Sequence, residues 1–220
     1  MFFNEPSPLL QRVIRLKAIK HKDGKLTLWN IPGLLSALYV TVYQQRLMEK
    51  LHAKEAANIL YNLGRFQAIQ GFRMTAKHFG YAKSIESKRR LLEFNTGQSE
   101  IVGTGKYKWI KMDFEKNLFL VVGKSTLAEE YKRFFGIQKM PVDHFMRGQG
   151  AGYIEELTGK KMLCVETKCI AMGHEYCEFV IKQFGEWDKK DRLVKEQIFT
   201  QLPDMKNLGA KMEPYLSLPS

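Results

Sequence analysis

Two cysteines and a glutamate in the last third of this 220-residue sequence have the types and spacing of metal ligands. They occur in the pattern Glu166-x2-Cys169-x7-Cys177, which can bring two soft thiolates and a carboxylate to one end of a strand pair. Zinc takes four ligands in a tetrahedron from Cys, His and Asp or Glu side chains. The pattern therefore predicts a half-shell for zinc that needs a further ligand.

The spacing leaves the fourth ligand open. Asp143 and His144 stand upstream, and His174 lies between the two cysteines. The pattern is neither CxxC…CxxC nor CxxC…HxxxH, the spacings typical of structural zinc sites. Taken alone, it favours a second interpretation, in which free buried cysteines pack as small hydrophobic side chains.

One helix and two strands must position these residues. Pro141 suits the first turn of a helix and Gly159 its C-terminal cap, which predicts a helix over residues 142–158. Alternation of side chains predicts strands over residues 162–166 and 177–181, joined by a loop that carries the first cysteine.

Paired glycines predict close packing of helices. Gly148 and Gly152 are four positions apart on the helix just described, and Gly64 and Gly71 are seven apart on another expected helix. Because glycine has no side chain, a second backbone can approach such a face closely. We expect both pairs to be features of the core.

This segment resembles the 4-vinyl reductase domain family, the sensor module of phenol- and xylene-responsive activators. The resemblance extends loosely over residues 23–182, and its last third is the specific part. The residues that carry it are Pro141, Val142, Phe145, Gly148, Gly152, Tyr153, Gly159, Glu166, Cys169, Gly173, Cys177 and Phe179.

The resemblance implies a complete metal site. Zinc-binding members of the family hold the metal with a Cys at the helix start and then with Glu, Cys and Cys. The matching positions here are Asp143, Glu166, Cys169 and Cys177, so a carboxylate replaces the first thiolate. Four protein ligands leave no open position for water, which implies a structural role. His144 or Cys164 could also close the site, or the metal is lost.

The resemblance also implies a fold, a dimer and a ligand. It implies an α+β domain, with helices on one face of an antiparallel sheet, that pairs two-fold and holds a hydrophobic small molecule between helices and sheet. Tyr153 is the first candidate for the ligand pocket because its hydroxyl could orient a ligand. Phe145, Trp109 and Phe119 are further candidates, and all four side chains suit an ordinary core equally well.

The rest of the chain predicts elements for such a domain. We expect residues 1–22 to form an N-terminal arm, 23–182 the ligand-binding domain and 183–220 a C-terminal helix and tail. The further expected elements are a helix at 9–20, a strand at 25–29, a helix from Pro32, a helix at 53–79, a basic helix at 83–94 ended by 95–97, strands at 99–102, 107–114 and 118–122, a helix at 127–135 capped by Ser125, and a surface helix at 187–201.

Composition limits the cellular setting. Three cysteines, an odd number, argue against a disulfide framework and favour a reducing cytoplasm. The N-terminus lacks a basic region followed by a long apolar one, so no secretion signal is expected. The formal net charge of +12 is scattered, and no nucleic-acid-binding motif is visible. A solvated basic surface is the preferred interpretation, with anionic lipid or nucleic acid as weaker alternatives.

The sequence therefore predicts a non-catalytic sensory domain that binds a hydrophobic small molecule, carries a structural zinc and acts as a homodimer. Its output would pass through a separate protein. No Ser/His/Asp, Cys/His or metal–water arrangement for catalysis is visible. The alternative comes from the similarity of the same fold to subunits of the TRAPP vesicle-tethering complex, which would make the chain a scaffold on a membrane surface.

Overall fold

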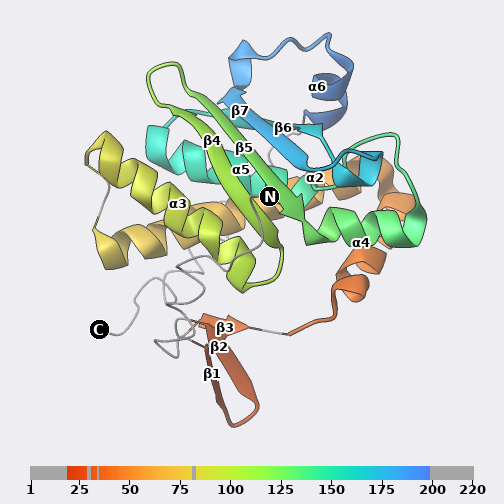
Figure 1. The fold of residues 1–220 in the computed structure, drawn as a ribbon, viewed down its shortest axis with the longest axis horizontal. Helices are drawn as coiled ribbons and strands as arrows, with labels where there is room; N and C mark the ends of the chain where they lie inside the picture. Colours follow the sequence, from red (N-terminus) through yellow and green to blue (C-terminus); the bar gives the residue numbers. More distant parts are fainter. Residues whose placement is uncertain (1–18, 29–30, 34, 81–82, 199–220) are drawn as a thin grey trace.

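A four-stranded antiparallel sheet is the centre of the molecule (Figure 1). The computed structural model describes residues 19–28, 31–33, 35–80 and 83–198. The strand order of the sheet is β4-β5-β7-β6. The strands are β4 (Gly105–Asp113), β5 (Leu118–Ser125), β6 (Met162–Lys168) and β7 (Cys177–Gln183). Alternate side chains of β5 are fully buried, which is the pattern of a sheet covered by helices on one face.

The helices confirm the predicted α+β architecture. α5 (His144–Thr158) packs against β6 and β7, and α2 (Leu38–Phe79) runs along α5. α2 is kinked at His52, where the backbone leaves helical geometry, so two helices are expected in this region and two helical segments are observed. The other helices are α3 (Ile85–Ile101), α4 (Thr126–Phe135) and α6 (Arg192–Gln197).

Glycines allow α2 and α5 to cross closely. A Cβ atom added to Gly148 would overlap the carbonyl oxygen of Tyr61, and one added to Gly64 would overlap the carbonyl oxygen of Phe145. These contacts confirm the predicted role of Gly64 and of the pair on α5. The prediction for Gly71 is wrong, because nothing lies within 4 Å of its absent Cβ.

The end of α3 differs from the prediction. The helix continues through residues 95–97, and the strand expected at 99–102 is its last turn. Asn95 is buried and donates from Nδ2 to the Leu91 carbonyl at 2.8 Å, so its side chain supports the helix that it was expected to end. The chain turns instead at Gly103, whose φ of 77° favours glycine.

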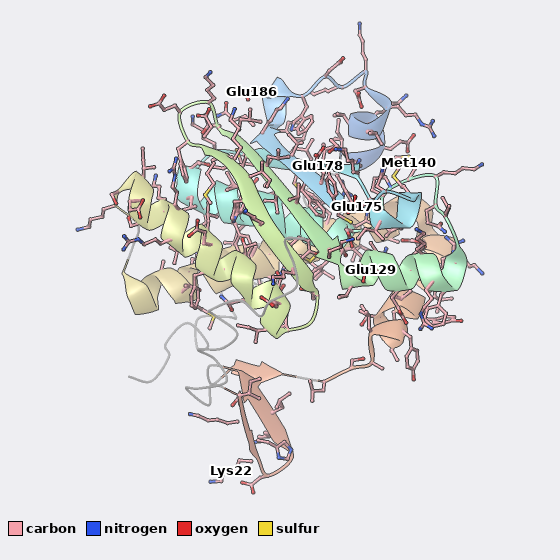
Figure 2. All side chains as sticks on the ribbon, in the orientation of Figure 1. Lys22, Glu129, Met140, Glu175, Glu178 and Glu186 are labelled. Atoms are coloured by element: carbon pink, nitrogen blue, oxygen red, sulfur yellow. The ribbon has the colours of Figure 1, made fainter. Side chains whose placement is uncertain are left out.

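The N-terminal elements also differ. A small antiparallel sheet contains β1 (Ile19–Lys22), β2 (Lys25–Leu28) and β3 (Ile31–Gly33). The predicted strand at residues 25–29 corresponds to β2, but the helix expected from Pro32 begins only at Leu38. Lys22 marks the tip of this small sheet, far from the central one (Figure 2).

Parts of three predictions lie outside the described residues. These parts are residues 1–18 of the N-terminal arm, Trp29 at the end of a strand, and the chain after residue 198. Residues 19 and 20, expected at the end of a helix, belong to β1. Among the described residues, no helix is both long and apolar enough to cross a membrane.

Candidate metal centre and ligand pocket

Four buried side chains converge at one end of β6 and β7. Their ligand atoms, from Asp143, Glu166, Cys169 and Cys177, all lie within 4.8 Å of one another. Asp143 immediately precedes α5, Glu166 lies on β6, Cys169 follows that strand, and Cys177 begins β7. Two carboxylates and two sulfurs are a donor set that suits zinc, and this buried group could hold a metal ion.

The other candidate ligands lie outside this group. The imidazole of His144 points to Arg147, with 2.9 Å between His144 Nδ1 and Arg147 Nη2. Cys164 is buried, but it is not part of the four-residue group. His174 is exposed. Of the residues that the sequence offered as a fourth ligand, the structure therefore brings Asp143 to the other three.

The hydrogen bonds of the cluster leave one acceptor for a cation. Ser125 Oγ donates to Asp143 Oδ1 at 2.8 Å, and the Asp143 backbone N–H donates to Glu166 Oε2 at 3.3 Å. The Ile170 N–H donates to Cys177 Sγ at 3.4 Å. Glu166 Oε1 is buried and receives no hydrogen bond from the described residues. A buried carboxylate oxygen without a donor is costly, and a metal ion would satisfy it.

Burial sets the protonation of the two carboxyl groups. It raises the pKa of Asp143 to about 6, against the lowering effect of the Ser125 hydrogen bond. Burial and the neighbouring Asp143 carboxylate raise the pKa of Glu166 well above its ordinary value. Between about pH 4 and pH 6 the metal-free folded centre thus holds protons that the unfolded chain releases. A metal ion competes with these protons, so its binding strengthens as the pH rises.

The two sulfurs differ in acidity. A hydrogen bond with the Cys177 thiol lowers the pKa of Cys169, although burial opposes this effect. The same interaction raises the pKa of Cys177, and burial adds to the rise. The metal-free pair therefore favours one thiolate that accepts a hydrogen bond from one thiol.

Two residues that the sequence interpretation missed support the cluster. The Arg147 guanidinium is fully buried, and its positive charge lowers the pKa values of Asp143 and Glu166. Gln197 on α6 accepts from the Glu166 N–H at 2.8 Å and donates to the Glu166 carbonyl at 3.0 Å. Arg147 was detectable as the residue one helical turn after Asp143. Nothing local to Gln197 indicates its contact with β6.

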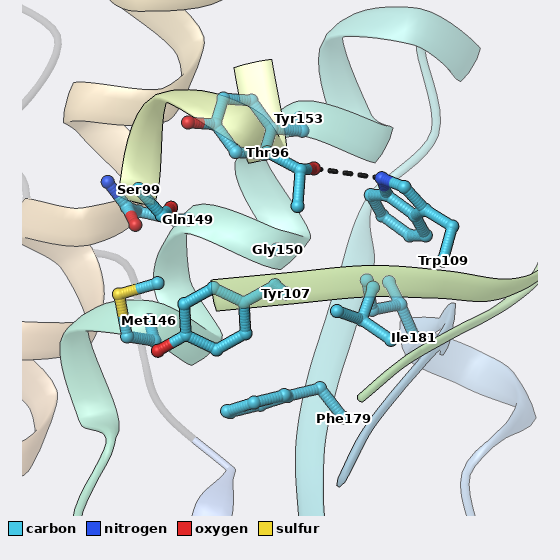
Figure 3. A pocket seen from close by; sticks show the side chains of 11 residues that line it. Thr96, Ser99, Tyr107, Trp109, Met146, Gln149, Gly150, Tyr153, Phe179 and Ile181 are labelled. Atoms are coloured by element: carbon cyan, nitrogen blue, oxygen red, sulfur yellow. Dashed lines mark hydrogen bonds between the residues drawn. The ribbon is translucent and has the colours of Figure 1, made fainter. Parts of the chain in front are cut away.

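A small cavity lies between α3, α5 and the sheet (Figure 3). Its volume is about 40 Å³, a few times the roughly 10–15 Å³ that one water molecule needs on this measure. Trp109 Nε1 donates to Thr96 Oγ1 at 2.8 Å at one side of the cavity. The lining residues are Thr96, Ser99, Tyr107, Trp109, Val121, Met146, Gln149, Gly150, Tyr153, Phe179 and Ile181.

The structure places two of the four predicted pocket residues at this cavity. Tyr153 and Trp109 line it. Phe119 is fully buried beside the Trp109 ring, with 6.4 Å between the ring centroids, and does not line the cavity. Phe145 is not among the lining residues, and the next residue of α5, Met146, takes that place. Thr96 and Ser99 were missed because α3 was expected to end before them.

Comparison with known proteins identifies the part of the chain that holds the cluster. Residues 123–183 match the model of the 4-vinyl reductase domain. Phenol regulator MopR of Acinetobacter guillouiae is 31% identical over 68 residues, which are 31% of this chain and 12% of MopR. The matched segment thus spans about an eighth of the length of that relative.

Solved structures share the fold over more of the chain. The phenol-responsive sensory domain of the transcription activator PoxR, solved with phenol, has a TM-score of 0.69 and 16% sequence identity, and the match covers 87% of this chain and 96% of that one. A trafficking protein particle complex subunit 3 from Naegleria fowleri, covalently bound to palmitic acid, has a TM-score of 0.47 and 9% identity over 66% of this chain and 94% of that one. This chain therefore carries a 4-vinyl reductase domain at residues 123–183, within the α+β fold of the PoxR sensory domain.

Proposed function

We propose that this chain is a non-catalytic sensory domain that binds a small hydrophobic molecule, with a structural zinc ion and a homodimeric state. The cavity between α3, α5 and the sheet is the observation that carries the proposal. It is lined mainly by apolar and aromatic side chains and has a few polar groups at its wall, as small-molecule sites do. The names of MopR and PoxR, a phenol regulator and a phenol-responsive activator, favour the same class of ligand.

The cavity favours a ligand of one aromatic ring. Its volume of about 40 Å³ excludes larger molecules unless side chains move. The bond from Trp109 to Thr96 offers both a donor and an acceptor that a ligand hydroxyl can share. Phenol has one apolar ring and one hydroxyl and fits both features. Ligand binding would then be reported to a separate output protein.

Zinc is the metal that fits the buried cluster. Asp143, Glu166, Cys169 and Cys177 would hold it, and when bound it would join the segment before α5 to β6 and β7. With four protein ligands the ion would have a structural role. The uncompensated oxygen of Glu166 supports this assignment.

Phenol should stabilise the protein saturably in a thermal-shift titration, because a ligand that binds only the folded state raises its stability. Replacing Trp109 by phenylalanine keeps an aromatic ring and removes the donor, so we expect phenol to bind about tenfold more weakly. Ile110→Ala, at an exposed position of the same strand, is the matched control and should bind phenol normally. Absence of any phenol effect, together with salt-sensitive binding to anionic vesicles, would favour the scaffold alternative.

The first segment of α2 supports the homodimer. Tyr39, Tyr43, Leu47 and Leu51 follow at intervals of four residues, so they form one apolar stripe on the helix. Their exposed fractions lie between 52% and 65%. A continuous exposed apolar stripe is typical of an interaction surface. Because a two-fold dimer uses the same surface on both subunits, a second copy of this chain can cover each stripe with the other.

Leu47→Glu should weaken this dimer strongly, because two introduced carboxylates would be buried without partners across the two-fold interface. Sedimentation velocity at several protein concentrations measures the change. Gln44→Glu places the same charge on the exposed side of the same helix and should leave the dimer intact. A wild-type chain that stays monomeric at all concentrations would rule out the dimer without affecting the ligand proposal.

A further inference from the structure

The ligand cavity and the metal cluster are separated by a single side chain. The ring of Tyr107 lines the cavity, where it lies near Met146 and Phe179 (Figure 3). The hydroxyl at the other end of this ring reaches the Ser125 side chain and donates to the Thr104 carbonyl at 3.2 Å. Tyr107 is therefore a wall of the cavity and a neighbour of the cluster at once.

Two glycines make the space for this ring. Tyr107 on β4 is directly paired with Gly123 on β5, and an added Cβ there would overlap the Tyr107 ring. A Cβ on Gly105 would come within 3.0 Å of the Tyr107 hydroxyl. Phe179 packs edge-on against the ring, with 6.0 Å between the centroids. The ring thus has little freedom to move unless its neighbours move too.

Ser125 continues the contact to the metal cluster. Its hydroxyl donates to Asp143 Oδ1 at 2.8 Å, and its oxygen accepts from the Ala128 N–H at 3.2 Å. Ser125 is fully buried and caps the start of α4. Since the single proton of Ser125 points to Asp143, its oxygen faces Tyr107 as a second acceptor, and the Tyr107 proton is shared between this oxygen and the Thr104 carbonyl. One line of polar contacts therefore runs from the cavity wall to a candidate metal ligand.

We propose that Tyr107 and Ser125 couple the ligand cavity to the metal centre, so that an aromatic ligand and zinc raise each other's affinity. A metal ion on Asp143 would fix the carboxylate, the Ser125 hydroxyl and so the Tyr107 ring. A ligand packed against that ring would fix the same groups from the other side. When two ligands order shared groups, the second to bind has less order to impose, which gives positive coupling. The inference rests on the proposed function, since it requires that both ligands bind.

The test measures zinc affinity by equilibrium competition with a chromophoric chelator, with and without saturating phenol. The wild type should hold zinc at least about fivefold more tightly in the presence of phenol, the lower end of typical allosteric coupling. Tyr107→Phe removes one hydroxyl and keeps the ring, and should reduce this effect to less than about twofold. Tyr153→Phe is the matched control, because it removes another buried hydroxyl at the cavity wall.

Each outcome has a distinct meaning. Coupling in the wild type and in Tyr153→Phe, but not in Tyr107→Phe, supports the proposal. If both ligands bind the wild type and phenol leaves zinc affinity unchanged, the coupling is excluded and the proposed function stands. If the two tyrosine variants lose coupling equally, the route through Ser125 is wrong. Failure of the wild type to bind zinc or phenol overturns both the coupling and the function on which it rests.

Discussion

Replacing Cys177 by alanine should abolish tight zinc binding and lower the free energy of unfolding by about 4 kcal/mol, when zinc is present at about a thousand times its Kd. The reason is that a metal held only by the folded state contributes its binding free energy to folding. Cys177 begins β7 and lies within 4.8 Å of the other three ligand atoms, so its loss leaves an open coordination position. Metal analysis and urea unfolding of the purified variant measure both effects.

Cys164→Ala is the control for this substitution. Cys164 is also a free, fully buried cysteine of the same sheet, but it is not one of the four clustered residues. We expect it to keep one zinc per chain and to lose only about 1 kcal/mol, as for an ordinary core truncation. If both variants retained zinc and lost equal stability, the cysteines would be core side chains and the metal centre would be wrong.

Residue types alone pointed to three members of the candidate centre. Glu166, Cys169 and Cys177 lie close in the sequence, and a strand pair with a short connection brings such residues together. Asp143 entered only through the family resemblance, because α5 separates it from the other three. Its two carboxylate oxygens accept from Ser125 and from Cys177. These contacts depend on tertiary packing that the sequence does not express as a pattern.

The ligand cavity shows why one local error had a large effect. Asn95, Thr96 and Gly97 have the composition of a helix end, but the buried bonds of Asn95 extend α3 by almost two turns. That extension supplies Thr96 and Ser99 to the cavity wall. Ser125 was expected as a helix cap and is one, but its second bond, to Asp143, comes from residues that are distant in the sequence. Local propensity identified the elements, and long-range packing determined which side chains meet.

Replacing Gly148 by alanine should destabilise the fold by at least about 3 kcal/mol, near the upper end for overpacking of a core. The added methyl group would overlap the backbone of α2 at Tyr61 and Arg65, and backbone atoms cannot turn aside as a flexible side chain can. α5 would have to move away from α2. Because Asp143 immediately precedes α5 and Tyr153 lies on it, the same movement should weaken zinc and phenol binding together.

Gly71→Ala isolates the packing effect. It is the same chemical change inside a helix, but nothing lies within 4 Å of the new methyl group. Alanine favours the helical state over glycine by about 1 kcal/mol, so this variant should be slightly more stable than the wild type. Urea unfolding of the two variants should therefore give shifts of opposite sign. A Gly148→Ala variant as stable as Gly71→Ala would show that the α2–α5 crossing is looser than these contacts require, and that the position of Asp143 does not depend on it.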